Sequence, residues 1–166
     1  TDIELDYYGS YTNSIGAFDY NLGVFYYTYP CADDAAAELD YFEFIPSLSY
    51  SFSEVMFSPD VYVQYGFSPD YFGEEGVGHN VEGGVSLSFP KGFGLDGWVG
   101  YQTVDGDVLG TEIEWTYWSV GLTKSVIGFD LDFRYHGADE DTSQALGPWL
   151  ANDGFNDDLF SFSISR

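Results

Sequence analysis

The stretch IELDYYGSYTNSIGAFDYNLGVFYYTYP, residues Ile3 to Pro30, alternates apolar and polar side chains, turns at NSIG, and then alternates again. In its first half Ile3, Leu5 and Tyr7 share one side of an extended chain, and the acidic residues between them share the other. A period of two is the pattern of a β-strand whose two faces differ chemically. The stretch therefore predicts a β-hairpin, and raises the question of what each face meets.

The composition bounds the answer. The chain has 166 residues, 45% of them hydrophobic and 20% aromatic, so we expect one folded domain rather than a disordered acidic tail. Its 28 Asp and Glu against 4 Lys and Arg give a net charge of -24. Nucleic acid is a poor partner because phosphate binding needs clustered basic residues, whereas cations and cationic solutes are better ones. A plain solvation role, as in proteins adapted to high salt, is the alternative.

The alternation recurs along most of the chain and predicts about nine strands. They cover residues 3–11, 17–29, 40–52, 55–67, 80–89, 95–103, 112–123, 129–136 and 158–166. Pro46 and Pro59 indicate bulges or edge positions in the third and fourth strands. The segment 112–123 is aromatic on both faces and its sides stay unassigned, and residues 33–40, DDAAAELD, are too short to count as a helix. The pattern predicts an all-β chain with antiparallel up-and-down connectivity.

Two arrangements satisfy such strands. In a soluble barrel or sandwich the apolar face points inward, and in an outer-membrane barrel it points to lipid while the polar face lines a wet lumen. Several patterns last about nine to twelve residues, longer than soluble strands, and their apolar faces carry aromatic residues at the ends. Short turns also alternate with long connectors. These features favour a transmembrane β-barrel, and two sheets packed over an aromatic core are the alternative. No apolar run reaches the roughly 20 residues of a membrane helix.

The motifs IELDYYGSY (3–11), FDYNLGVFYYTYP (18–30), ELDYFEF (38–44), GFGLDGWVGYQ (92–102) and YWSVGLTKSVIGFDLDFRYHGAD (117–139) carry a family resemblance. Over most of its length the chain resembles the TorF-type family of proposed porins, a proteobacterial group first catalogued as conserved proteins of unknown function. The motifs belong to barrel strands and are no catalytic signature. The resemblance implies an outer-membrane β-barrel with a pore role.

The chain departs from that family at its ends. Members share an earlier Gly-rich aromatic region that is absent here, and outer-membrane strands usually finish on an aromatic residue, where this chain ends in SISR. Bacterial single-chain barrels also close with an even number of strands. We therefore expect residues 1–166 to be a single β-barrel domain that lacks one to three N-terminal strands and the extreme C-terminus, with ten or twelve strands in the intact barrel.

A luminal polar face would carry mostly carboxylates, with one basic residue among them. The predicted pore-lining residues are Asp2, Glu4, Asp6, Asp19, Glu82, Asp96, Asp130, Asp132 and Arg134. A lumen of this sign concentrates cations and repels anions, so weak cation selectivity is expected. The alternative is a narrow barrel plugged by Tyr8, Phe25, Tyr27 and Trp98.

Other candidate chemistry is weaker. Acidic loops at 105–107, 138–141 and 152–158 lack the EF-hand spacing, so solvated loops are the preferred interpretation over calcium sites. His79 and His136 have no zinc-site spacing. His136 beside Asp132, Arg134 and several serines suggests a hydrolase only loosely, because no GxSxG motif is present. We predict no enzyme activity, no metal and no cofactor. The single cysteine, Cys31, forms no internal disulfide, and its role stays open.

The sequence thus predicts a protein of the Gram-negative cell outer membrane, a porin for passive diffusion of small solutes or cations. Its expected partners are outer-membrane lipid and those solutes, and its oligomeric state is open. The alternative is a soluble or surface-exposed acidic β-protein that binds a partner or calcium through its long loops. Extraction only with detergent would favour the first, and solubility without it the second.

Overall fold

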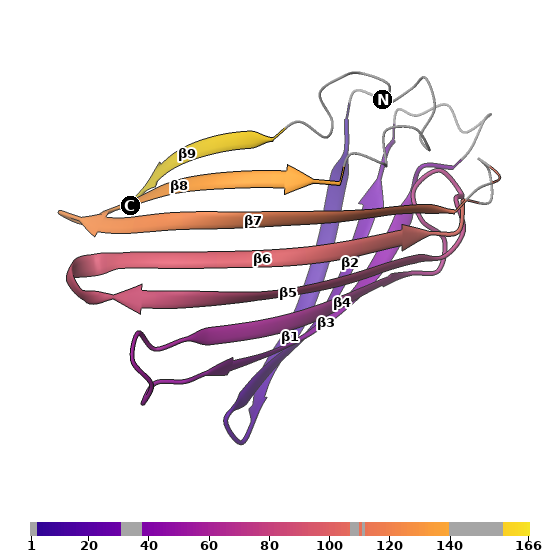
Figure 1. Cartoon of the computed structure of the whole chain (residues 1–166). Coiled ribbons are helices and arrows are strands. Elements are labelled where there is room, and N and C mark those ends of the chain that lie inside the picture. The colour runs from indigo at the N-terminus through magenta and orange to yellow at the C-terminus, as the bar shows by residue number, and fades with distance from the viewer. Residues whose placement is uncertain (1–2, 31–37, 107–109, 111, 140–157) are drawn as a thin grey trace.

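The computed structural model describes residues 3–30, 38–106, 110, 112–139 and 158–166. Nine strands form one antiparallel sheet in which every strand lies beside its neighbours in sequence (Figure 1). The strands are β1 (Leu5–Ile15), β2 (Phe18–Thr28), β3 (Tyr41–Ser51), β4 (Asp60–Ser68), β5 (Gly78–Phe89), β6 (Phe93–Val104), β7 (Ile113–Val126), β8 (Phe129–Ala138) and β9 (Leu159–Ser165). The all-β, antiparallel, up-and-down prediction is confirmed.

Helical structure in the described residues is confined to one 3₁₀ turn, η1 (Pro90–Gly92), between β5 and β6. Nowhere in this part of the chain does a helix have the length and apolar character needed to cross a membrane.

The hairpin turns follow local backbone chemistry. Ile127 and Gly128 join β7 to β8 with φ angles of 53° and 79°. Two successive residues with positive φ give a turn whose twist matches that of the strands it joins. Gly16, with φ 65°, serves the β1–β2 turn in the same left-handed region, which glycine enters at little cost.

The two proline predictions were wrong. Pro46 lies inside β3, and Phe44↔Phe67 and Ser47↔Gln64 keep one register on either side of it, so there is no bulge. Pro59 lies outside the strand, because β4 begins at Asp60 and not near Val55. Residues 52–59 instead form a compact turn, closed by the Phe52 amide donating to the Pro59 carbonyl at 2.8 Å.

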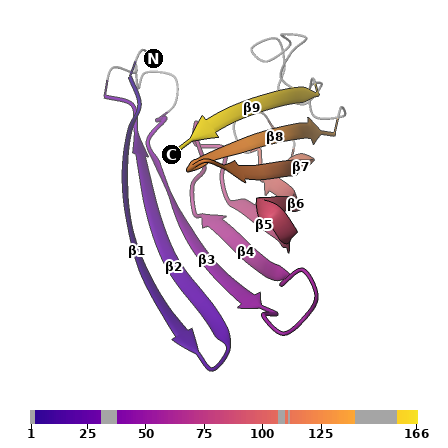
Figure 2. The same cartoon turned by 90° about the vertical axis from the view of Figure 1, so that its left-hand side faces the viewer.

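The sheet curls strongly, so that β1–β3 stand at a steep angle to β6–β9 (Figures 1 and 2). Side chains on the inner side of the curve reach over an intervening strand, since Nδ2 of Asn80 on β5 donates to the Tyr117 hydroxyl on β7 at 2.6 Å, across β6. The strands β1 and β9 are the two edges of the sheet. The expected closure into a barrel is therefore not a feature of the described sheet, which is an open gutter.

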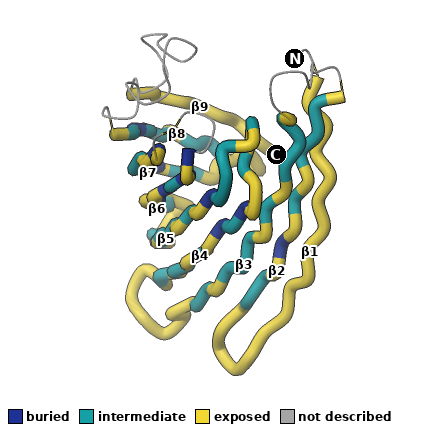
Figure 3. The backbone as a smooth tube through the Cα atoms, turned by 90° about the vertical axis from the view of Figure 1, so that its right-hand side faces the viewer, coloured by how far each residue is buried: buried dark blue, intermediate teal, exposed yellow. Residues whose placement is uncertain are grey.

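The curl defines a concave and a convex face, between which successive side chains of each strand alternate. Buried polar residues belong to the concave face, among them Gln102 and Ser119, which are 6% and 3% exposed. Only Val104 and Ile113 are buried apolar side chains among the described residues. Figure 3 shows the buried stretches scattered along the inner strands, with β1 exposed throughout. This sheet has a polar interior and no apolar core of the usual kind.

Candidate functional site

The convex face is apolar and uncovered. Val81, Val99 and Phe133 on β5, β6 and β8 are each half exposed or more, at 50%, 53% and 53%. The same face carries exposed apolar side chains on all nine strands, for example Leu5, Val24, Phe44, Val63, Val81, Val99, Val120, Phe133 and Phe162. Soluble monomers rarely leave so large a continuous apolar surface open to water.

The concave face collects the charged residues that the sequence predicted there. Strand pairing places them in common rows, so that Asp60, Ser86, Asp96, Gly121 and Arg134 stand side by side on β4 to β8. The predicted residues on this face are Asp6, Asp19, Glu82, Asp96, Asp130, Asp132 and Arg134. Glu4 precedes β1, and Asp2 lies outside the described residues.

Arg134 is the centre of a charged cluster on this face. Its Nη1 and Nη2 donate to Oδ1 and Oδ2 of Asp96 at 2.6 and 2.9 Å. Nη2 also donates to Asp132 at 3.0 Å and Nη1 to the Ser119 hydroxyl at 3.2 Å. A bidentate guanidinium–carboxylate pair is among the stronger polar contacts, and the cluster ties β6, β7 and β8 together.

Glycines on the concave face make room for these side chains. A Cβ on Gly121 would lie 2.5 Å from Nη2 of Arg134 and 2.9 Å from Oδ2 of Asp96. A Cβ on Gly100 would collide with the ring of Tyr117, and one on Gly84 would lie 2.5 Å from Cε1 of Tyr62. A small residue on one strand thus lets a long side chain from the next lie flat against the sheet.

A second polar network, which sequence reasoning missed, lies toward the long-loop end of the sheet, the end where the long connectors β2–β3, β4–β5 and β6–β7 lie. The Tyr62 hydroxyl donates to Glu82 at 2.6 Å. Nδ2 of Asn80 donates to Gln102 at 2.9 Å and to the Tyr117 hydroxyl at 2.6 Å. Alternation placed Asn80 and Glu82 on the polar side, but their partners on β4, β6 and β7 follow only from the strand register.

Aromatic rings also share the concave face. Tyr8, Phe25, Tyr27 and Tyr41 form a chain of near-parallel rings with centroids 5.8, 6.4 and 4.6 Å apart. Trp98 meets the ring of Tyr117 edge-on at 5.4 Å. The four residues of the predicted plug are therefore all on the inner face, while Tyr8 is 77% exposed on the edge strand.

The seventh strand is resolved into two faces. Ile113, Tyr117, Ser119 and Gly121 of β7 belong to the concave side, and Val120 belongs to the convex side. Both faces do carry large aromatics, because Trp118 is convex while Tyr117 is concave. Only the pairing with β6 separates them, which is why alternation alone left this strand unassigned.

At the long-loop end Asp40 fastens the start of β3 to the end of β2. Its carboxylate accepts from the Tyr26 hydroxyl at 2.9 Å, the Thr28 hydroxyl at 2.7 Å and the Tyr29 amide at 2.7 Å. The hydrogen bond from the Tyr29 backbone amide has the largest effect and the one from the Thr28 hydroxyl the next largest, and together they hold the pKa of Asp40 below its usual value. Nearby, burial beside Glu43 raises the pKa of Tyr71 to about 12.

The histidines do not share a site. His79 lies on the convex face, where its Nδ1 is 2.6 Å from the Tyr65 hydroxyl, and His136 lies on the concave face, 3.2 Å from the Ser161 hydroxyl. Within the described residues no group of three or more metal-ligating side chains is present. Asp107, residues 140–157 and Cys31, and with them most of the candidate calcium loops, fall outside the described residues.

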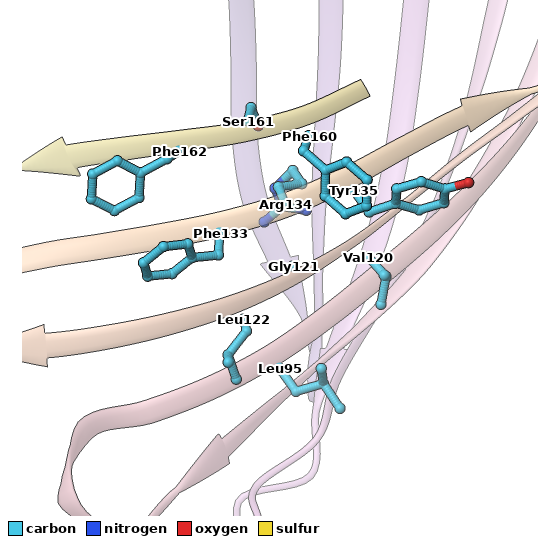
Figure 4. A pocket seen from close by; sticks show the side chains of 10 residues that line it. All are labelled: Leu95, Val120, Gly121, Leu122, Phe133, Arg134, Tyr135, Phe160, Ser161 and Phe162. Carbon is cyan, nitrogen blue, oxygen red and sulfur yellow. The ribbon is translucent and has the colours of Figure 1, made fainter. Parts of the chain in front are cut away.

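A shallow apolar groove of about 390 Å³ crosses the convex side of β6 to β9 (Figure 4). Side chains from four strands line it, and the concave residues Arg134 and Ser161 border it from behind. The lining apolar residues are Leu95, Val120, Leu122, Phe133, Phe160 and Phe162. The groove contains no charged group of the convex face.

Comparison with known proteins gave one match. The family described as "Bacterial protein of unknown function (Gcw_chp)" matches residues 1–166. A search of curated proteins and a search of solved structures each returned no match to this chain. The predicted resemblance therefore holds as far as a bacterial family, and nothing in these matches concerns porins.

Proposed function

We propose that this chain, which belongs to the Gcw_chp family of bacterial proteins of unknown function, is an outer-membrane β-barrel protein of the porin type. Small solutes or cations diffuse passively along its concave face, and outer-membrane lipid covers the convex one. The resemblance to TorF-type proposed porins is part of this proposal, as are the location in the cell outer membrane and the lack of catalysis.

The observation that carries the proposal is the distribution of side chains between the two faces, which is the reverse of that in a soluble β-protein. Apolar side chains are exposed across the convex side of all nine strands, while an ion pair and hydrogen-bonded amides, hydroxyls and carboxylates fill the concave side. Exposure of the apolar convex surface to water is unfavourable in free energy. Contact with lipid acyl chains removes that cost. Strands of nine to fourteen residues, all except the seven-residue β9, are long enough to cross hydrocarbon when tilted.

The charge of the concave face supports cation preference. Arg134 is its one basic residue among the described strands, and two carboxylates already hold that guanidinium. Asp6, Asp19, Glu43, Asp60 and Glu82 lie on the same face. A low-dielectric wall with this excess of negative charge raises the local cation concentration.

The test is the reversal potential of single channels in a planar bilayer under a KCl gradient. The proposal predicts detergent-dependent extraction, a measurable conductance and a reversal potential displaced toward the potassium equilibrium value. Anion preference, or no conductance from protein shown to be inserted, would contradict it. A protein that stays soluble without detergent would favour the acidic binding protein considered above.

A further inference from the structure

The concave face holds a hollow of about 340 Å³ beside the Arg134 cluster. Two carboxylates, two aromatic rings and two serine hydroxyls line it together with Val61, Val85 and Gly97; the polar and aromatic lining residues are Asp60, Asp96, Tyr62, Trp98, Ser49 and Ser86. Its volume is at the lower end of ordinary small-ligand sites. These groups combine negative charge with flat aromatic surface.

The strand register shows that a basic side chain, Arg134, occupies the interval on the opposite side of Asp96 from the hollow. Arg134 on β8 reaches across Gly121 on β7 to bind Asp96 on β6. On the other side of Asp96, Ser86 on β5 separates it from Asp60 on β4. Asp60 is thus two strands from Asp96, as Arg134 is, or about 10 Å at ordinary strand spacing. The hollow lies over that second interval, which no basic side chain of the described residues fills.

The aromatic walls suit a flat cation. Tyr62 and Trp98 both flank Gly84, where a Cβ would lie 2.5 Å from the Tyr62 ring and 2.9 Å from Cβ of Trp98. Guanidinium groups stack on aromatic faces and bind carboxylates through paired N–H donors. Asp96, which lines the hollow, accepts one hydrogen bond from Arg134 on each oxygen and so retains further acceptor capacity.

We propose that the hollow between Asp60 and Asp96 binds an organic cation bearing a guanidinium group. The ligand donates to Asp60 and to Asp96 and packs against the rings of Tyr62 and Trp98. Arg134 fills the neighbouring interval in the same way as far as its hydrogen bonds to Asp96 and Asp132 are concerned. The inference rests on the proposed function in that the concave face must be open to water, and it names the class of solute held there.

The experiment compares methylguanidinium with its uncharged isostere methylurea. Ligand-detected saturation-transfer NMR follows each compound on the full chain in detergent at constant ionic strength. Saturable binding of methylguanidinium alone is expected. Asp60→Asn should weaken it by about tenfold or more through loss of a charged acceptor, and Trp98→Leu by roughly threefold through loss of stacking.

The matched control is Glu54→Gln, which removes the same charge from the neighbouring β3–β4 turn and should leave binding within about twofold of the parent. Equal binding of methylurea, an unchanged affinity in Asp60→Asn, or an equal loss in Glu54→Gln would overturn the inference. Reversal potentials on the same preparations separate the two claims. A cation-selective channel without methylguanidinium binding defeats this site alone, and binding without conductance defeats the porin proposal alone.

Discussion

At the scale of single residues, Arg134 explains how a face rich in carboxylates remains ordered. Its guanidinium donates to Asp96 and Asp132 from between them, with side chains only 18%, 24% and 28% exposed. Without it, two partly desolvated carboxylates would face each other with no counter-charge. A buried charge that has lost its partner costs more free energy than the intact ion pair contributes to stability.

Replacement of Arg134 by Gln should therefore lower the free energy of unfolding by about 2 kcal/mol. In a double-mutant cycle with Asp96→Asn, the two losses should be non-additive by about 1 kcal/mol or more. Urea unfolding in micelles measures both. Additive losses would show that the two side chains are not coupled. The control Asp19→Asn, on the same face but bonded only to the Ser14 hydroxyl at 2.5 Å among its described contacts, should change stability by less than about 0.5 kcal/mol.

Asp40 is a second residue whose contribution can be isolated, this time by pH. Because its folded pKa is lowered, its stabilising effect is present above the unfolded value of about 3.9 and is lost as pH falls through the folded value. Unfolding curves of the parent and of Asp40→Asn should therefore differ near neutral pH and converge in acid. A difference that persists unchanged down to about pH 2 would rule out the carboxylate as its source.

At the scale of the strands, the concave glycines decide how closely side chains from neighbouring strands approach the sheet. Gly121→Ala places a methyl group where Arg134 and Asp96 meet, so we expect a loss of about 2 kcal/mol from the displaced ion pair. Gly9→Ala on β1 is the matched control, because nothing lies within 4 Å of its added Cβ. Thermal unfolding of both variants in one detergent makes the comparison. Equal effects would mean that strand glycines act through backbone entropy and not through the space they leave.

The period-two pattern carried most of the element-scale information. It predicted nine strands, their order and the side on which Asp96, Asp132 and Arg134 lie, because alternation is a local property of an extended chain. The meeting of Arg134 with Asp96 depends on the relative shift of β6, β7 and β8. Register is set by pairing between segments, and a single sequence does not record it.

The misplaced strand boundary has a local cause. Alternation from Val55 to Phe67 looks continuous, yet Phe57 and Ser58 have φ angles of 69° and 42°, which a strand does not contain. Their left-handed geometry depends on the turn that closes from Phe52 to Pro59. Pro59, inside the apparent strand, was the available signal, because β4 begins directly after it at Asp60.

At the scale of the whole molecule, the sheet is organised opposite to a soluble β-sandwich. Its exposed apolar side chains lie mostly on the outer surface, and the Arg134 ion pairs and the Asn80 hydrogen bonds lie on the inner one. A single curled sheet also leaves no second layer to cover the convex face in the described structure. The sandwich alternative considered for the sequence is therefore wrong, and the surroundings of the convex face become the central question.

A nitroxide scan along β5 in lipid vesicles answers that question most directly, with labels placed one at a time from Val81 to Ser88 in a Cys31→Ser background. If acyl chains cover the convex face, collision with dissolved oxygen should peak at Val81, Val85 and Leu87. Collision with a water-soluble nickel chelate should peak at Glu82, Ser86 and Ser88 instead. The opposite phase, or no alternation between the two relaxing agents, would contradict the account.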